Sequence, residues 1–167
     1  GYHKSLIERN HNVFGSLELA HKEISSTVDL ALSFQVIEHV EDPVDYLTKI
    51  YSLLNKNGKL ILFTPNLNDI MLKLHFDVYA PFFFRTVHNF YFNANSLVKI
   101  GLEAGFKKHE TLHYHNFGLD NSFNWLKHNS PKKDLKVDGI DDNINSQWKK
   151  YLESTGQSYN VGLILTK

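Results

Sequence analysis

Two histidines are the side chains best suited to proton chemistry. His39 closes a polar tip that follows an apolar stretch, and His88 lies in a segment rich in aromatic residues. An imidazole titrates near neutral pH, so either ring could take up or release a proton during a reaction. The alternative for His39 is structural, with the ring ordering the loop before a helix. His39 is the first candidate for catalysis, and His88 is the second.

Residues 29–66 contain the elements that must position His39. Residues 30–34 form an apolar run that is too short for a helix and therefore predicts a strand. Asp42 and Pro43 then mark a helix start, because a carboxylate caps the first turn and proline has no N–H to leave unpaired. Apolar residues recur on one face of this helix, at Val44, Leu47, Ile50, Tyr51 and Leu54. Lys56 and Gly58 are expected to end it, and residues 60–63 predict a second strand.

This strand–loop–helix–strand order is typical of a parallel sheet whose strands are buried on both faces. In open α/β sheets, functional residues gather beyond the carboxyl ends of the strands. Here those ends are residues 34–39 and 64–66. The sequence therefore predicts a site at this edge of the sheet.

The remaining segments complete a single domain over residues 1–167. We expect a helix end at 2–9, a short strand at 12–19, a helix at 93–105, a strand at 106–115, a polar insert at 120–157 with a helix at 145–152, and a last strand at 160–165. The expected fold class is α/β: a partial Rossmann-like, doubly wound sheet, mostly parallel with an antiparallel edge strand.

Composition excludes several kinds of function. Lys plus Arg equals Asp plus Glu at 18 each, so neither a nucleic-acid footprint nor a membrane-surface patch is expected. Without cysteine there are no disulfides and no thiolate metal sites. His113 and His115 could share a strand face, but no third ligand is spaced nearby, so no metal is expected. Apolar runs are strand-length and no signal peptide opens the chain, so a soluble, cytoplasmic protein is the default expectation. Gly1 in place of Met indicates a processed, tagged or excerpted chain.

Several segments together resemble a class I S-adenosylmethionine-dependent methyltransferase. Residues 33–40 with the adjoining EHVEDP stretch at 38–43 resemble the fourth strand and its exit in a small-molecule subgroup. Residues 59–66 resemble the fifth strand. His88-Asn89-Phe90-Tyr91-Phe92, followed by Ala104-Gly105-Phe106, resembles the next helix and the entry to the sixth strand. The resemblance covers residues 12–115 well and the remainder loosely.

The resemblance implies S-adenosylmethionine as cofactor and a small-molecule acceptor that is methylated on a hydroxyl, amine or carbon. Ser16 and Leu17 resemble the residues that meet the adenine, although Ser16 fits a helix-capping role equally well. Phe34 and Gln35 resemble residues that border the methionine portion, although a strand-end Phe is often core. His39 would be the base for transfer to a hydroxyl. The aromatic segment 68–92 would cover the acceptor pocket or form a buried connector.

The chain also departs from the family pattern. The family holds the methionine end of its cofactor on a Gly-rich turn and the ribose on an acidic residue. The nine glycines here form no G-x-G. The chain thus looks like the C-terminal portion of such an enzyme, and we expect it to bind S-adenosylmethionine weakly by itself. Two other interpretations remain: a non-catalytic remnant that binds a partner protein, and a different nucleotide-binding α/β enzyme.

Without a preceding first strand, the run at residues 30–34 would leave one edge unpaired. Such an edge is a template for pairing with another strand. Either residues 13–19 shift inward to fill the gap, or a second copy of the chain pairs along it as a two-fold homodimer.

Overall fold

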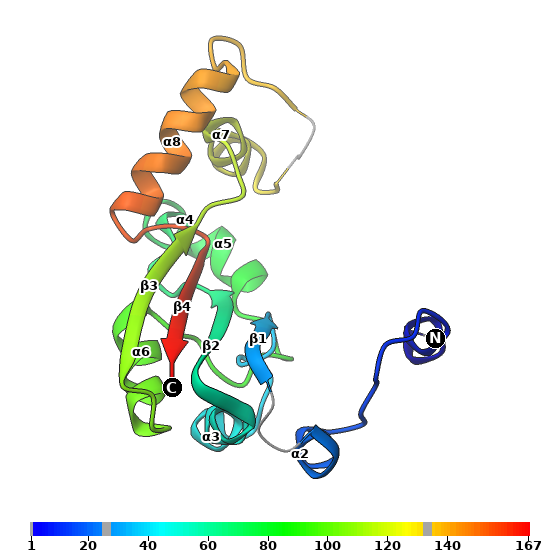
Figure 1. Ribbon diagram of the computed structural model, residues 1–167. Helices are drawn as coiled ribbons and strands as arrows, with labels where there is room; N and C mark the ends of the chain where they lie inside the picture. The colour runs from blue at the N-terminus through cyan, green and yellow to red at the C-terminus, as the bar shows by residue number, and fades with distance from the viewer. Residues whose placement is uncertain (1, 25–27, 132–134) are drawn as a thin grey trace.

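A computed structural model of the chain describes residues 2–24, 28–131 and 135–167, without the side chains of Tyr2 and His3. The elements in chain order are α1 (Tyr2–Glu8), α2 (Leu17–Ile24), β1 (Val28–Phe34), α3 (Pro43–Leu53), β2 (Leu54–Pro65), α4 (Ile70–Leu74), α5 (Phe76–Phe83), α6 (Ala94–Glu103), β3 (Lys108–Tyr114), α7 (Leu119–His128), α8 (Asp142–Ser154) and β4 (Asn160–Thr166). Figure 1 shows the sheet at the centre, with α7 and α8 beyond one of its ends.

The described strands form one sheet of four, in the order β1-β2-β4-β3. β1 and β2 are parallel, with Leu32 opposite Ile61. β4 runs antiparallel to both β2 and β3. The expected α/β class is confirmed, with the antiparallel pair β3–β4 at one side of the sheet. The antiparallel strand itself lies one position in from the edge, between β2 and β3.

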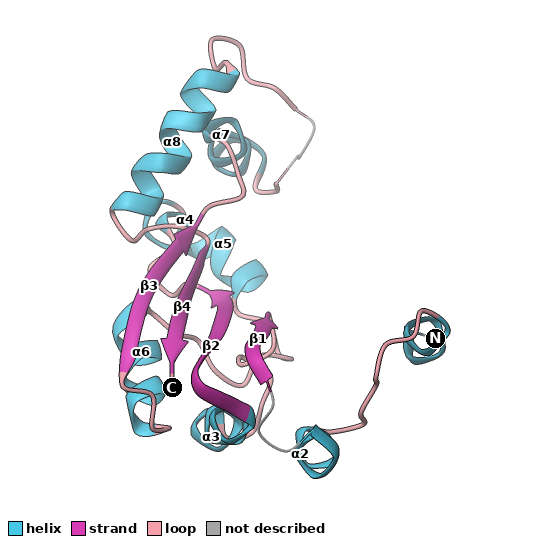
Figure 2. Ribbon diagram, viewed as in Figure 1, coloured by secondary structure: helices cyan, strands magenta, loops and turns pink. Residues whose placement is uncertain are grey.

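Helices α3 and α6 cover one face of this sheet (Figure 2). The core between them contains alternate residues of β2 and β4, and Leu60 faces Leu165 across the strand pair. The fully buried core side chains include Leu47, Leu60, Leu62, Leu97, Leu163 and Leu165. Burying such side chains is the main source of stability in a fold of this kind.

The opposite face of β1 is exposed in the described part of the chain. Leu30, Leu32 and Phe34 point to this face and are 52%, 59% and 52% exposed. Their neighbours Ile61 and Phe63 on β2 are half-buried. The expectation that these strands are buried on both faces is therefore wrong for β1. A contiguous exposed apolar surface of this kind is typical of an interaction surface.

Helix α3 begins where the sequence predicts. Asp42 is the N-cap, and its side chain accepts hydrogen bonds from the backbone N–H groups of Val44 and Asp45. The expected end at Lys56 and Gly58 is wrong, because the helix stops at Leu53 and β2 starts with the next residue. Gly58 is instead needed inside β2, where a Cβ atom would lie 2.8 Å from the carbonyl oxygen of Asn55.

The strand expected at residues 12–19 is also wrong. Residues 11–16 form no helix or strand, and α2 begins at Leu17. The Ser16 hydroxyl accepts a hydrogen bond from the Leu19 N–H, so the polar break caps a helix. Residues 13–19 consequently do not fill the open edge of β1, which pairs only with β2 among the described strands. The homodimer stays a prediction.

The polar insert at 120–157 holds α7 and α8, apart from residues 132–134, which lie outside the described residues. The helix expected at 145–152 is part of the longer α8, and the strands expected at 106–115 and 160–165 appear as β3 and β4. None of the helices in the described ranges is both long enough and apolar enough to cross a membrane.

Candidate active site at the carboxyl ends of β1 and β2

A polar pocket opens where β1 and β2 end, as the strand order predicts. It encloses about 310 Å³. Its walls come from the turn after β1, the end of β2, the last residues of α5 with the segment that follows, and the residue before β4. The lining residues are Gln35, Glu38, His39, Pro65, Phe82, Phe83, Arg85, Val87, His88 and Tyr159. We call it the polar pocket.

Backbone hydrogen bonds fasten the segment around His88 to the turn around His39. The Asn89 N–H donates to the carbonyl oxygen of Glu38 at 2.7 Å. The Asn89 side-chain amide donates to the carbonyl oxygens of His39 and Val40 at 3.0 and 3.2 Å. Two stretches that are far apart in the sequence thus form one wall of the pocket.

The orientation of His39 follows from a single contact. Its Nδ1 lies 2.8 Å from the carbonyl oxygen of Val87. A carbonyl can only accept, so Nδ1 carries the hydrogen and Nε2 keeps a free lone pair. This Nε2 lies 4.0 Å from Oε1 of Glu38, and the His39 side chain is 42% exposed. His39 is therefore arranged as a proton acceptor that a ligand can reach.

Glu38 and His88 stand beside His39 with unsatisfied polar atoms. Glu38 is 1% exposed, and its Oε2 accepts a hydrogen bond from the Thr64 hydroxyl at 3.0 Å. Its Oε1 and the Nδ1 of His88 are buried without a hydrogen-bond partner among the described residues. Burial lowers the pKa of His88 below its usual range, which favours the neutral imidazole.

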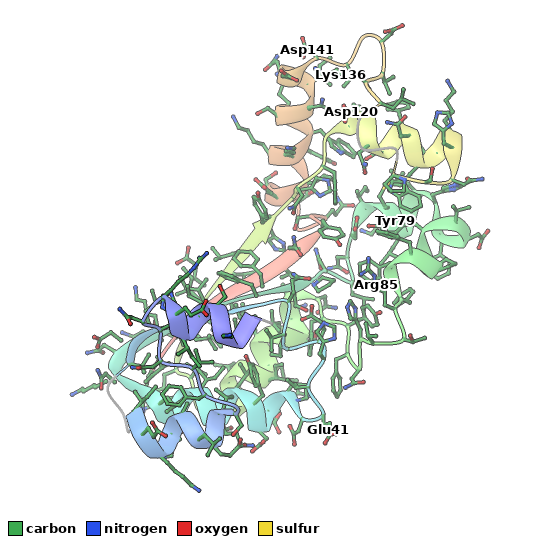
Figure 3. All side chains as sticks on the ribbon, turned by 90° about the vertical axis from the view of Figure 1, so that its right-hand side faces the viewer. Glu41, Tyr79, Arg85, Asp120, Lys136 and Asp141 are labelled. Carbon is green, nitrogen blue, oxygen red and sulfur yellow. The ribbon has the colours of Figure 1, made fainter. Side chains whose placement is uncertain are left out.

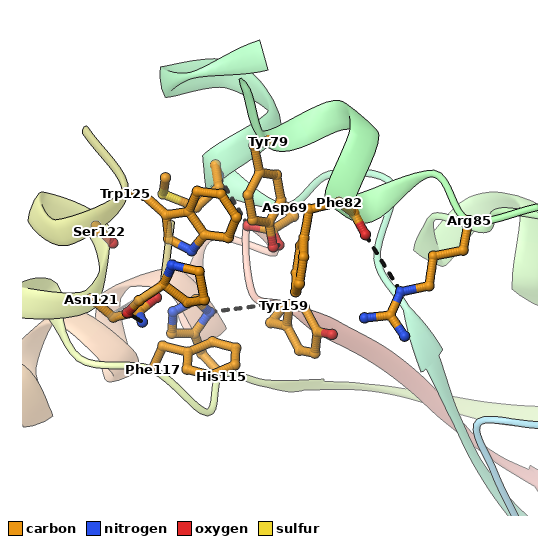
Figure 4. Close-up of a pocket in the computed structure, with 12 residues that line it drawn as sticks. Asp69, Tyr79, Phe82, Arg85, His115, Phe117, Asn121, Ser122, Trp125 and Tyr159 are labelled. Atoms are coloured by element: carbon orange, nitrogen blue, oxygen red, sulfur yellow. Dashed lines mark hydrogen bonds between the residues drawn. The ribbon is translucent and has the colours of Figure 1, made fainter. Parts of the chain in front are cut away.

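A second cavity, the aromatic pocket, adjoins the polar pocket through the shared walls Phe82, Arg85 and Tyr159. It encloses about 260 Å³. Figure 3 shows Tyr79 and Arg85 on the segment between the sheet and the α7–α8 pair. Figure 4 shows Trp125 and Tyr79 on one side of the pocket, and Phe117 and His115 on the other. The Tyr79 and Trp125 rings meet edge to face, with their centroids 5.0 Å apart.

Asp69 is a buried carboxylate in the wall of the aromatic pocket. It is 1% exposed and accepts hydrogen bonds from the Tyr79 hydroxyl at 2.8 Å and the Met71 N–H at 3.0 Å. Burial raises its pKa to about 6, because desolvation disfavours the charged form more than the two hydrogen bonds favour it.

His115 offers a hydrogen-bond donor to the same pocket. Its Nδ1 accepts the backbone N–H of Tyr159 at 3.0 Å, so the hydrogen of the neutral ring is on Nε2. Burial lowers its pKa to about 4, which keeps the ring neutral at pH 7. Nε2 is buried and has no partner in the described ranges. The ring lines the cavity, where a ligand acceptor atom would satisfy this donor.

The structure brings together three of the residues singled out from the sequence. Gln35, His39 and His88 all line the polar pocket. Gln35 has a left-handed backbone, with φ of 55°, and its amide donates to the Asn160 side chain at 3.0 Å. Phe34 lies instead on the exposed sheet face, against Phe63.

The two residues expected at the adenine lie at the start of α2 rather than in the polar pocket. Ser16 caps this helix. Leu17 lines a separate groove between α2 and α3, together with Val40 and Tyr46. Their expected role toward the adenine stays a prediction.

Sequence reasoning missed most of the aromatic pocket. Asp69, His115, Trp125 and Tyr159 come from four different segments, and no local pattern links them. Asp69 did carry one signal, because it caps the short helix α4. Its burial against Tyr79 depends on the packing of α5 and could not be read from that cap.

Comparisons with known proteins place the chain in a known family. A family model described as a methyltransferase domain matches residues 4–111. No curated protein matches the chain. The structure is similar to a SAM-dependent methyltransferase from Thermotoga maritima, with a TM-score of 0.55, 18% identity, and coverage of 86% of this chain and 57% of that one. It is also similar to a SAM-dependent methyltransferase from Archaeoglobus fulgidus, with a TM-score of 0.58 and 14% identity. That match covers 98% of this chain and 71% of the other.

The chain belongs to the methyltransferase domain family, and its fold is that of the S-adenosylmethionine-dependent methyltransferases. S-adenosylmethionine is the cofactor of that class. The chain spans only 57% of the length of the Thermotoga maritima structure. The expected methyltransferase family and α/β fold class are confirmed, and the small-molecule subgroup stays a prediction.

Proposed function

We propose that this chain carries the acceptor side of an enzyme that transfers the methyl group of S-adenosylmethionine to a small molecule. The reacting atom of the acceptor lies in the polar pocket, and its body lies in the adjoining aromatic pocket. The observation that carries this proposal is the orientation of His39, whose Nδ1–H is held by Val87 while Nε2 faces the pocket with a free lone pair.

The chemistry follows from that lone pair. As the acceptor oxygen or nitrogen attacks the methyl carbon, its proton passes to Nε2 of His39. The carbon–sulfur bond breaks, its electron pair returns to sulfur, and the products are the methylated acceptor and S-adenosylhomocysteine. The proton on His39 is then released to solvent through its exposed side.

The aromatic pocket favours an acceptor with a flat organic body. Its rings can pack against both faces of a planar group, and a cavity of about 260 Å³ has room for more than one benzene-sized ring. The Nε2–H of His115 would donate to an oxygen of that body. We therefore favour a hydroxylated or carbonyl-bearing aromatic acceptor over a simple aliphatic one.

The test measures S-adenosylhomocysteine formed by the complete protein with a panel of small phenols, aromatic amines and aromatic ketones. His39→Asn is expected to lower turnover roughly a hundredfold or more, while cofactor affinity changes little. His109→Asn is the matched control, because His109 is exposed on β3 and lines neither pocket. Equal turnover of the two variants with a true acceptor would contradict the role of His39.

One observation favours a second function, a non-catalytic module that binds a partner protein. The exposed face of Leu30, Leu32 and Phe34 is apolar and lies beside an unpaired strand edge in the described chain. Failure of the complete protein to bind S-adenosylhomocysteine in calorimetry would favour this module over the enzyme.

A further inference from the structure

Glu38, His39 and His88 together form a cluster that the proposed methyl transfer does not fully use. Each offers one ligand atom, and the three atoms lie within 4.8 Å of one another. Two polar atoms of these residues, Oε1 of Glu38 and Nδ1 of His88, are buried and unpaired within the described ranges. Leaving such groups unpaired typically costs about 1–3 kcal/mol each. An ion, a ligand atom or an ordered water bound between them would remove this cost.

The three side chains are already held in orientations that suit a metal ion. His39 gives its Nδ1–H to the Val87 carbonyl, which is how metal-binding histidines are commonly held, and this leaves Nε2 free. Glu38 is fixed through Oε2 by the Thr64 hydroxyl, so Oε1 faces the cluster. The rings of His39 and His88 meet edge to face with centroids 4.7 Å apart.

The spacing also suits an ion. Zinc bonds to nitrogen and oxygen of about 2.0–2.2 Å place tetrahedral ligand atoms roughly 3.4 Å apart. The distance between Oε1 of Glu38 and Nε2 of His39 is 4.0 Å. An inward shift of each side chain by less than about 1 Å would therefore bring the three ligand atoms to bonding distance of one ion. The alternative to an ion is a hydrogen bond between two of these three atoms, and it would leave the third atom without a partner.

We propose that Oε1 of Glu38, Nε2 of His39 and Nδ1 of His88 bind a divalent transition-metal ion, with Zn²⁺ the preferred occupant. Two imidazoles and one carboxylate are a ligand set of catalytic zinc sites, whereas Mg²⁺ and Ca²⁺ prefer oxygen ligands alone. His113 and His115, the pair considered from the sequence, bind Ser158 and Tyr159 instead.

Three protein ligands leave at least one coordination position free. All three residues line the polar pocket, so this position faces the space assigned to the acceptor. Nε2 of His39 is free to act as the base of the proposed methyl transfer only while no metal is bound; with the metal bound, Nε2 is a ligand, and the metal would instead lower the pKa of an acceptor hydroxyl. Only this consequence rests on the proposed function; the metal site does not.

The experiment titrates the complete, chelator-treated protein with Zn²⁺ in a calorimeter and with Co²⁺ in an absorption spectrometer. We expect one ion per chain with micromolar or tighter affinity, and visible Co²⁺ bands of a four- or five-coordinate site. Glu38→Gln and His88→Asn should each weaken Zn²⁺ binding at least tenfold. His109→Asn, which alters an exposed histidine, should leave it unchanged.

Absence of binding, or binding that Glu38→Gln and His88→Asn leave unchanged, would overturn the proposal. Because a variant could lose metal binding simply by failing to fold, a second measurement uses the unmodified protein. Histidine-ring ¹⁵N NMR should show Zn²⁺ shifting Nε2 of His39 and Nδ1 of His88, and shifts confined to other histidines would overturn the site. Metal binding without methyl transfer would contradict the proposed function and leave the metal site standing.

Discussion

The backbone N–H of Asn89 donates a 2.7 Å hydrogen bond to the carbonyl oxygen of Glu38. This contact joins the turn after β1 to the segment after α5, and it brings His88 to His39. Both stretches were recognised separately in the sequence. Their contact places the two candidate histidines on one wall of the polar pocket.

Asn89→Ala should loosen this junction. The variant loses the side-chain hydrogen bonds to the carbonyl oxygens of His39 and Val40 while keeping the backbone bond to Glu38. We expect a loss of about 1 kcal/mol in the free energy of unfolding, measured with urea. Asn95→Ala is the control, because Asn95 is exposed on α6 and alanine favours a helix. An equal loss in both variants would contradict the proposed role of Asn89.

Asp69 should make stability fall as the pH rises. Its pKa is about 6 in the folded chain against an ordinary 3.8, so the folded state holds its proton over a pH range in which the unfolded state has lost it. Stability contributed by the protonated form is therefore present below about pH 4 and is lost by about pH 6. Two pKa units correspond to about 3 kcal/mol.

Urea unfolding of the wild type and Asp69→Asn at pH 4 and pH 7.5 tests this effect. From pH 4 to pH 7.5, the free energy of unfolding of the variant should rise by up to about 3 kcal/mol relative to that of the wild type, because asparagine does not ionise. Asp77→Asn alters an exposed carboxylate on α5 and serves as the control. A stability difference between wild type and Asp69→Asn that is the same at both pH values would show that Asp69 titrates normally.

The exposed face of β1 predicts self-association of the 167-residue chain. Leu32 is 59% exposed beside the unpaired edge, so a second copy can pair there and bury this face. Leu32→Lys should shift the chain from dimer to monomer in sedimentation velocity. Leu102→Lys, at a residue 48% exposed on α6, should not. A monomeric wild type at high concentration would rule out the dimer.

Local signals were enough to predict part of the fold. Asp42 and Pro43 placed the start of α3 because capping depends on adjacent residues. At Ser16 the local signals allow both a polar break within a strand and a helix cap, and the structure shows the cap, at the start of α2. Short amphipathic segments carry too little periodicity to decide between helix and strand without their packing partners.

The candidate site, too, could be predicted from the sequence only in part. Gln35 and His39 were found because they directly follow a predicted strand, where α/β folds place function. The contact of His88 with Glu38 and His39 and the burial of Asp69 and His115 depend on how α5, α7 and β4 pack. Those contacts are tertiary, so the sequence alone could not predict them.

The most direct test of the central claim is ultraviolet cross-linking of the complete protein with S-adenosylmethionine carrying a radioactive methyl group, followed by peptide mapping. We predict label in the peptide that contains Gln35 and His39, and loss of that label when excess S-adenosylhomocysteine competes. Label confined to other peptides, or label that the competitor does not displace, would contradict the claim that the carboxyl end of β1 is where the methyl donor meets its acceptor.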